Sequence, residues 1–190
     1  MSQLTFAELR QRLNERMPVR AMQSGRIEAA VAIVLAPDER DVLHLLFIKR
    51  AEVAADPWSG QMALPGGRRE AQDPDLLTTA TRETCEETGV RLEPETLLGE
   101  LDDLAPVTPT LPPIVVRPFV FGLPAQPVVR PSSEVALYVW ADLDGLTAAA
   151  GESEITIRGA RLTVPSYRVG SHVVWGMTQR IIRHLLDLAT

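Results

Sequence analysis

Apolar and polar residues follow different periods along the chain, and each period predicts a kind of element. Residues 5–17 place Leu9 and Leu13 on one side of an amphipathic helix. Two apolar runs follow, at 27–36 and 42–49, with turn-forming residues between them. The chain therefore begins with a helix and continues into a β-hairpin.

The next stretch changes from turn formers to a strong helix signal. Residues 56–67 are rich in Pro and Gly and are interpreted as a loop. A helix is then predicted from about Pro74 to Thr88. Asp73 is placed to cap its start, and Gly89 suits its end.

The second half of the chain is predicted to form β-strands followed by a C-terminal helix. Four stretches are typical of β-strands: 114–123, 134–140, 154–158 and 161–164. Apolar residues at helical spacing predict a C-terminal helix at about 175–189. Strands with helices at the start, middle and end predict an α/β fold with a mixed β-sheet.

Composition limits the classes of function. The chain has 190 residues, 45% of them hydrophobic, as is ordinary for a globular protein. Its net charge of −6 argues against a nucleic-acid or anionic-membrane binder. The chain lacks a signal-peptide pattern and an apolar membrane span, and its single cysteine cannot form an internal disulfide. A cytoplasmic protein is expected, and an anionic small-molecule substrate stays open because a divalent metal reverses the local charge.

The predicted middle helix gathers carboxylates. Glu83, Glu86 and Glu87 fall within about 100° of arc on one side of it. One interpretation is a solvated acidic face. Carboxylates near a helix C-terminus oppose the helix dipole, however, and a hard cation such as Mg²⁺ or Mn²⁺ removes that penalty. Gly66 and Gly67 just ahead leave room for a backbone carbonyl at the same ion, so the metal interpretation is favoured.

These residues carry a family resemblance. The segment GGRREAQDPDLLTTATRETCEETGV resembles the Nudix box, G-x5-E-x7-R-E-U-x-E-E-x-G-U, where U is aliphatic. The box covers residues 67–90, and the order of strand, loop and helix around it is similar to that of Nudix hydrolases. It departs in three ways: Asp73 replaces the first glutamate, one extra residue precedes Arg82, and Thr84 stands at an aliphatic position.

The resemblance implies a role for each matching residue. Glu83 and Glu87 would be the main ligands of Mg²⁺ or Mn²⁺, and Glu86 would share a second ion or the bound water. The Gly67 carbonyl would complete the metal site. Arg82 would orient a glutamate by a bidentate contact that lysine cannot reproduce.

Two further residues receive lesser roles. Asp73 would cap the helix and reach back to Arg82. Cys85 points away from the glutamates and is expected to be a buried, incidental small side chain.

The resemblance also implies a fold. A Nudix-type α/β/α sandwich with a mixed β-sheet is expected, as one domain over 1–190. The box helix would pack on one side, with the helix at 175–189 close to it. A homodimer is compatible with the sequence.

The substrate is suggested by a branch of the family. Residues 60–75, 131–143 and 165–186 resemble the coenzyme A diphosphatase branch. Its members cleave coenzyme A or its thioesters to 3′,5′-ADP and a 4′-phosphopantetheine product. This chain departs from the branch at 51–60, which is acidic where the branch carries a basic, His-containing run.

Several residues near the box are substrate-binding candidates. Arg50, Arg68 and Arg69 are the basic residues placed to grip a phosphate. Gln61 belongs to the Gly-Gln pair of the branch. Trp58 either stacks on an adenine or covers the core.

Other interpretations stay open. Glu134 matches a later acidic position of the family and is either an extra ligand or general base, or half of a surface ion pair. The alternative substrate is a nucleoside triphosphate, or a dinucleoside or sugar diphosphate. A Nudix-fold binding protein without turnover is disfavoured, because the Arg-Glu-x-x-Glu-Glu core is retained.

Overall fold

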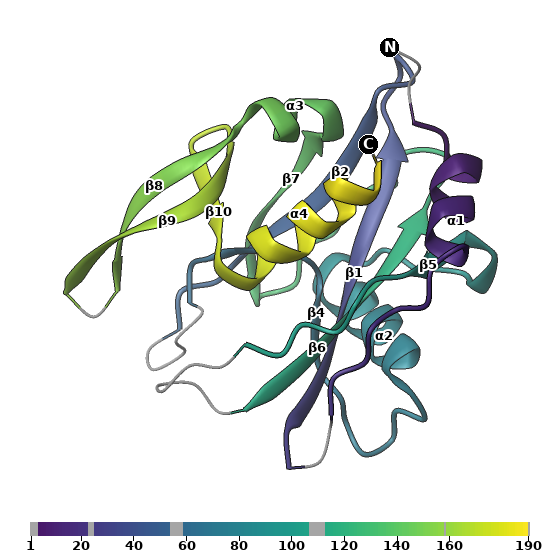
Figure 1. Cartoon of the computed structure of the whole chain (residues 1–190), viewed down its shortest axis with the longest axis horizontal. Helices are drawn as coiled ribbons and strands as arrows, with labels where there is room; N and C mark the ends of the chain where they lie inside the picture. The colour runs from purple at the N-terminus through teal and green to yellow at the C-terminus, as the bar shows by residue number, and fades with distance from the viewer. Residues whose placement is uncertain (1–3, 23–24, 54–58, 107–112, 158, 190) are drawn as a thin grey trace.

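A computed structural model places a mixed β-sheet at the centre of the molecule (Figure 1). It describes residues 4–22, 25–53, 59–106, 113–157 and 159–189. The central strand β1 (Ile27–Pro37) pairs antiparallel with β2 (Leu43–Arg50) and parallel with β6 (Ile114–Gly122). The predicted hairpin and the α/β class with a mixed sheet are therefore confirmed.

Four shorter or outer strands complete this sheet. β5 (Leu97–Glu100) pairs with β6, and β4 (Gly66–Arg68) pairs with β1. β3 (Met62–Ala63) and β7 (Val135–Asp142) both pair with β2. β3 and β4 begin inside the stretch 56–67 that was predicted as a loop, because strands of two or three residues leave no alternation to detect.

Helices cover both faces of the sheet. Ala30, Ala32 and Val34 of β1 pack in one apolar cluster with α2 (Leu76–Thr88). The intervening Ile33 and Leu35 pack in another, with α1 (Phe6–Asn14) and α4 (Gly176–Ala189).

This arrangement confirms the α/β/α sandwich, and Figure 1 shows α4 and α2 on opposite sides of the sheet. The expectation that the C-terminal helix lies close to the box helix is therefore wrong. The physical reason is that β1 is apolar at successive positions and needs cover on both faces.

Helix ends follow local chemistry. Thr5 and Glu8 form a capping box at the start of α1. The helix ends at Asn14, ahead of the predicted Met17, where Pro18 disfavours helical backbone. Asp75, and not Asp73, caps α2: its Oδ1 accepts a hydrogen bond of 2.7 Å from the Thr78 amide. The predicted end at Gly89 is confirmed by its left-handed backbone, with φ of 70°.

A second, three-stranded antiparallel sheet carries the chain from β7 to α4. After the short helix α3 (Leu143–Ala148), it is formed by β8 (Ala150–Ile157), β9 (Ala160–Val169) and β10 (His172–Trp175). β8 and β9 are longer than the predicted stretches 154–158 and 161–164. The prediction also missed β10, α3, β5 and a single 3₁₀ turn at Pro94–Thr96. Among the described helices, none has the length and apolar character needed to cross a membrane.

Two glycines let β4 lie directly on β1. Gly66 has φ of 150° and is paired with Val31, while Gly67 is paired with Ala30. A Cβ added at Gly66 would lie 2.3 Å from the Ala30 carbonyl oxygen, which is backbone and cannot move aside. The approach of these two strands therefore requires glycine.

Replacing Gly66 by alanine is expected to lower the unfolding free energy by about 2 kcal/mol or more, through overpacking and backbone strain. Gly151→Ala is the matched control, because a Cβ there would meet nothing within 4 Å. Chemical denaturation of both variants measures the difference. Equal stability of the two variants would contradict this account of β4.

Candidate metal and active site

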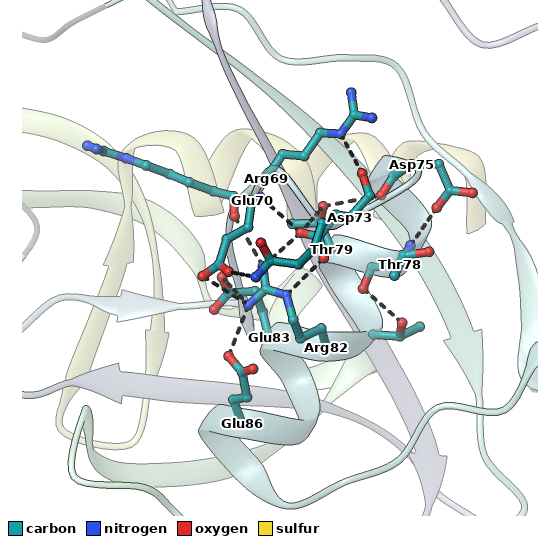
Figure 2. Close-up of polar contacts among 12 residues, drawn as sticks. Arg69, Glu70, Asp73, Asp75, Thr78, Thr79, Arg82, Glu83 and Glu86 are labelled. Carbon is teal, nitrogen blue, oxygen red and sulfur yellow. Dashed lines mark hydrogen bonds and ion pairs between the residues drawn. The ribbon is translucent and has the colours of Figure 1, made fainter.

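Arg82 is the centre of the polar cluster on α2 (Figure 2). Its Nε and Nη2 donate to the two carboxylate oxygens of Asp73, at 3.0 and 2.9 Å. Its Nη1 donates to Glu83 Oε1 and to Glu86 Oε2, both at 3.0 Å. One planar guanidinium thus fixes Asp73 on one side and orients two glutamates on the other.

Asp73 is a buried anchor. Its side chain is almost fully enclosed and also accepts hydrogen bonds from the Glu70 amide and the Thr79 hydroxyl. The two bonds from Arg82 hold the pKa of Asp73 well below its usual range, so the carboxylate stays charged. The predicted contact of Asp73 with Arg82 is therefore present.

The other carboxylates lie against the backbone of β4. Glu87 is buried, with 4% of its surface exposed, and its Oε2 accepts a hydrogen bond of 2.9 Å from the Gly66 amide. A Cβ at Gly67 would lie 2.4 Å from a carboxylate oxygen of Glu83. The glycine pair therefore allows the strand to lie directly beside Glu83 and Glu87.

Burial gives these carboxylates unusual proton affinities. Desolvation raises the pKa of Glu87 to about 7, and the charges of Glu83 and Glu134 add to the effect. Desolvation also raises the pKa of Glu83, with contributions from Glu86 and Glu134. A buried carboxylate of this kind is stabilised in its charged form when a cation binds beside it.

Residues from other elements reach the same region. Glu134 precedes β7 and is exposed, and its charge acts on both Glu83 and Glu87. Arg50 ends β2, and its positive charge partly offsets the burial that raises the Glu87 pKa. Backbone hydrogen bonds fix their segments: Ala51 N donates to the Glu134 carbonyl, and Arg50 N donates to the Gln61 carbonyl. The fold therefore brings together residues that the sequence separates widely.

The donor set fits a hard divalent cation. Glu83, Glu86 and Glu87 supply carboxylate oxygens from one side of α2, and oxygen ligands suit Mg²⁺ and Mn²⁺. Over the described residues, no three carboxylate, imidazole or thiol groups already form a metal-binding group. The glutamates are held instead by Arg82 and by the Gly66 amide.

The remaining candidates differ in their surroundings. Arg68 is exposed, and its side chain makes no hydrogen bond or ion pair with another described residue. All three guanidinium nitrogens of Arg69 donate to protein oxygens. Gln61 is half-buried, and Trp58 lies outside the described residues. Cys85 is a half-buried free thiol, so the expectation that it is buried is wrong.

Some members of the cluster had no signal in the sequence. Thr79 donates to Asp73 from inside the helix, and Glu28 contacts Arg69 from β1. Both contacts depend on how α2 and its preceding loop lie on the sheet. Neither position carries a motif that would identify it.

Comparison with known proteins places this geometry in a family. The NUDIX domain family matches residues 26–158. The mitochondrial coenzyme A diphosphatase NUDT8 of Homo sapiens is 34% identical over 170 residues, covering 86% of this chain and 71% of that protein. An uncharacterized protein of Schizosaccharomyces pombe is 36% identical over 132 residues, covering 66% of this chain and 40% of its own length.

A solved structure agrees in fold. The MutT/nudix family protein from Enterococcus faecalis superposes with a TM-score of 0.62 at 17% identity, over 96% of this chain and 68% of that one. The family match covers most of the chain and includes the helix that carries Arg82 and its glutamates. This chain belongs to the NUDIX family and is a Nudix hydrolase, a pyrophosphohydrolase by class.

Proposed function

We propose that the chain uses Mg²⁺ or Mn²⁺ to hydrolyse the diphosphate linkage of coenzyme A or an acyl-CoA. The products would be 3′,5′-ADP and 4′-phosphopantetheine or its acyl form. The observation that carries the metal-dependent chemistry is the Arg82 cluster, which orients Glu83 and Glu86 beside the buried Glu87. Similarity to the human and mouse NUDT8 proteins, at 34% and 30% identity, supports the substrate.

Each residue of the cluster has a distinct task in this proposal. Glu83 and Glu87 hold the cation, with Glu86 and the Gly67 carbonyl as further oxygen donors. When bound, the cation neutralises diphosphate oxygens and lowers the pKa of a bound water. Arg82 keeps Glu83 and Glu86 oriented. Glu134, exposed and close enough to act on Glu83 and Glu87, is proposed as the general base or an additional ligand.

The substrate's phosphates need cationic partners. Arg50 and Arg68 are proposed for this role, because the charge of Arg50 acts on Glu87 and Arg68 is exposed directly after Gly67. Arg69 carries the same charge, but its three nitrogens already donate to the protein. Gln61 and Trp58 are proposed to contact the nucleotide, with Trp58 stacking on the adenine.

One feature favours a different nucleotide. Residues 51–60 contain Glu52 and Asp56 and no basic residue. Carboxylates facing the 3′-phosphate of coenzyme A would repel it. A nucleoside triphosphate or another diphosphate is therefore the second candidate substrate. The cytoplasmic location and a homodimer stay predictions, and the NUDT8 relatives are named as mitochondrial.

Glu83→Gln and Glu87→Gln are each expected to lower kcat at saturating Mg²⁺ by more than about a hundredfold. Mutation of a residue that only hydrogen-bonds to a metal ligand already lowers activity or metal affinity by about ten- to a hundredfold, so loss of a ligand itself should cost more. Circular dichroism should show that both variants stay folded. Glu39→Gln, at an exposed position in the β1–β2 turn, is the control and should retain normal kcat. Near-normal turnover by Glu87→Gln would remove Glu87 from the ligand set.

The pKa of Glu87 predicts how the metal-free protein responds to pH. The pKa of Glu87 is about 7 in the folded state and lies above the ordinary 4.5, so protonation of Glu87 stabilises the folded state, and this contribution is complete below pH 4.5. The contribution is lost as the pH rises through 7 and the buried carboxylate becomes charged. In EDTA, Tm is therefore expected to fall between about pH 5 and pH 8, and Glu87→Gln should fall less. Identical pH dependence of the two proteins would contradict the burial of a charged Glu87.

The substrate is tested by comparing kcat/KM for coenzyme A and 3′-dephospho-coenzyme A. If Arg50 or Arg68 binds the 3′-phosphate, its alanine variant should lower kcat/KM for coenzyme A alone, by roughly ten- to a hundredfold for a charged hydrogen bond. Release of 3′,5′-ADP is followed by chromatography. Hydrolysis of other diphosphates with no cleavage of either compound would leave a Nudix hydrolase with a different substrate.

A further inference from the structure

Arg69 lies in the loop between β4 and α2, and its guanidinium donates to three separate acceptors. Its Nε donates to the Asp73 carbonyl at 3.1 Å, and its Nη2 donates to the Pro74 carbonyl at 2.9 Å. Its Nη1 donates to Glu28 Oε2 at 2.8 Å. The guanidinium therefore joins the loop that leads into α2 to the side chain of Glu28.

Glu28 provides a fixed point for this bridge. It lies on β1 and is in register with Val115 of β6, so its backbone belongs to the parallel centre of the sheet. The Arg69 amide also donates to the Glu28 carbonyl at 2.9 Å. Arg69 is thus attached to Glu28 through both its backbone and its side chain.

The loop held by Arg69 carries the anchor of the glutamates. Arg69 binds the carbonyl of Asp73, and the carboxylate of Asp73 binds Arg82 through two hydrogen bonds. Arg82 in turn binds Glu83 and Glu86. A continuous series of hydrogen bonds therefore runs from the sheet to the carboxylates of α2.

We propose that Glu28 and Arg69 form a positioning pair, which sets the place of Asp73 and Arg82 and through them the metal-binding carboxylates. Arg69 on this account contacts the protein and not the substrate. The inference rests on the proposed function, because it concerns the same metal site. It goes beyond that proposal by assigning a role to two residues that bind neither the cation nor the substrate.

The chemistry of the contact explains why an arginine suits this position. Three acceptors lie around one planar group, and a guanidinium presents donors in a rigid fork. A lysine carries the same charge but is a single point donor that cannot reach three acceptors together. Arg69→Lys therefore separates positioning, which needs the fork, from attraction of an anionic substrate, which needs the charge.

The test measures Mn²⁺ binding by electron paramagnetic resonance, in the absence of substrate, for Arg69→Lys, Glu28→Ala and the double variant. Each single variant is expected to bind Mn²⁺ about tenfold more weakly, as for other residues that orient metal ligands. The double variant should match the singles, because the two residues act as one unit. In turnover, kcat should fall while KM for the substrate stays unchanged.

Arg40→Lys is the matched control, since Arg40 pairs with Asp38 in the exposed β1–β2 turn. It should leave Mn²⁺ affinity unchanged. Melting in EDTA identifies variants that fail to fold, and Glu28→Gln then replaces Glu28→Ala because it keeps the shape of the side chain while removing the charge that pairs with Arg69. Weaker Mn²⁺ binding by folded Glu28→Gln would support the pair.

Other results would overturn the inference. Normal Mn²⁺ affinity with a raised KM in an Arg69→Ala variant would place Arg69 on the substrate. Fully additive losses in the double variant would show that Glu28 and Arg69 act separately. A wild-type protein that binds no Mn²⁺ would overturn the proposed metal site and this inference together, whereas normal binding by the variants would overturn the inference alone.

Discussion

The ion pair between the buried Asp73 and the partly exposed Arg82 is the contact on which the rest of the site depends. Both guanidinium edges of Arg82 are committed, one to Asp73 and the other to Glu83 and Glu86. Asp73 is enclosed and held further by the Glu70 amide and the Thr79 hydroxyl. An ion pair satisfied in this way has little freedom to rearrange, so it transmits the position of the loop to the glutamates.

The second constraint is the close approach of a strand to a helix. Gly66 and Gly67 allow β4 to lie between β1 and the carboxylates of α2. The result is a buried Glu87 whose pKa is raised to about 7 by desolvation. Burial makes the charged carboxylate unfavourable when alone, and a cation bound beside it would stabilise the charged form, as the proposed metal site requires.

The sequence predicted the parts of the fold that have long, regular patterns. The β1–β2 hairpin, β6, α2 and α4 all carry enough residues for a period to be visible. The cap of α2 was misplaced because Asp73 and Asp75 lie two residues apart and both suit the role. Only the fold shows that Asp73 turns inward to Arg82 and leaves the cap to Asp75.

Glu83, Glu86 and Glu87 were identified from the sequence because helical spacing puts them on one side of α2, and the roles of the other box residues came from the resemblance to the Nudix box. The contacts that join separate elements were not identified from the sequence. Arg69 and Glu28 are 41 residues apart, and neither spacing nor residue type links them. Likewise, α4 was expected close to α2 but lies on the opposite face of the sheet. A sequence pattern shows that a helix is amphipathic, but it does not show which face of the sheet the helix covers.

The proposed chemistry requires α2 and β4 together to hold one or more divalent cations. A crystal of the Mn²⁺-soaked protein, measured for anomalous scattering, tests it most directly. We expect an anomalous peak within coordination distance, about 2.0–2.6 Å, of carboxylate oxygens of Glu83 and Glu87. A peak elsewhere, with Glu83 still bound only to Arg82, would contradict it.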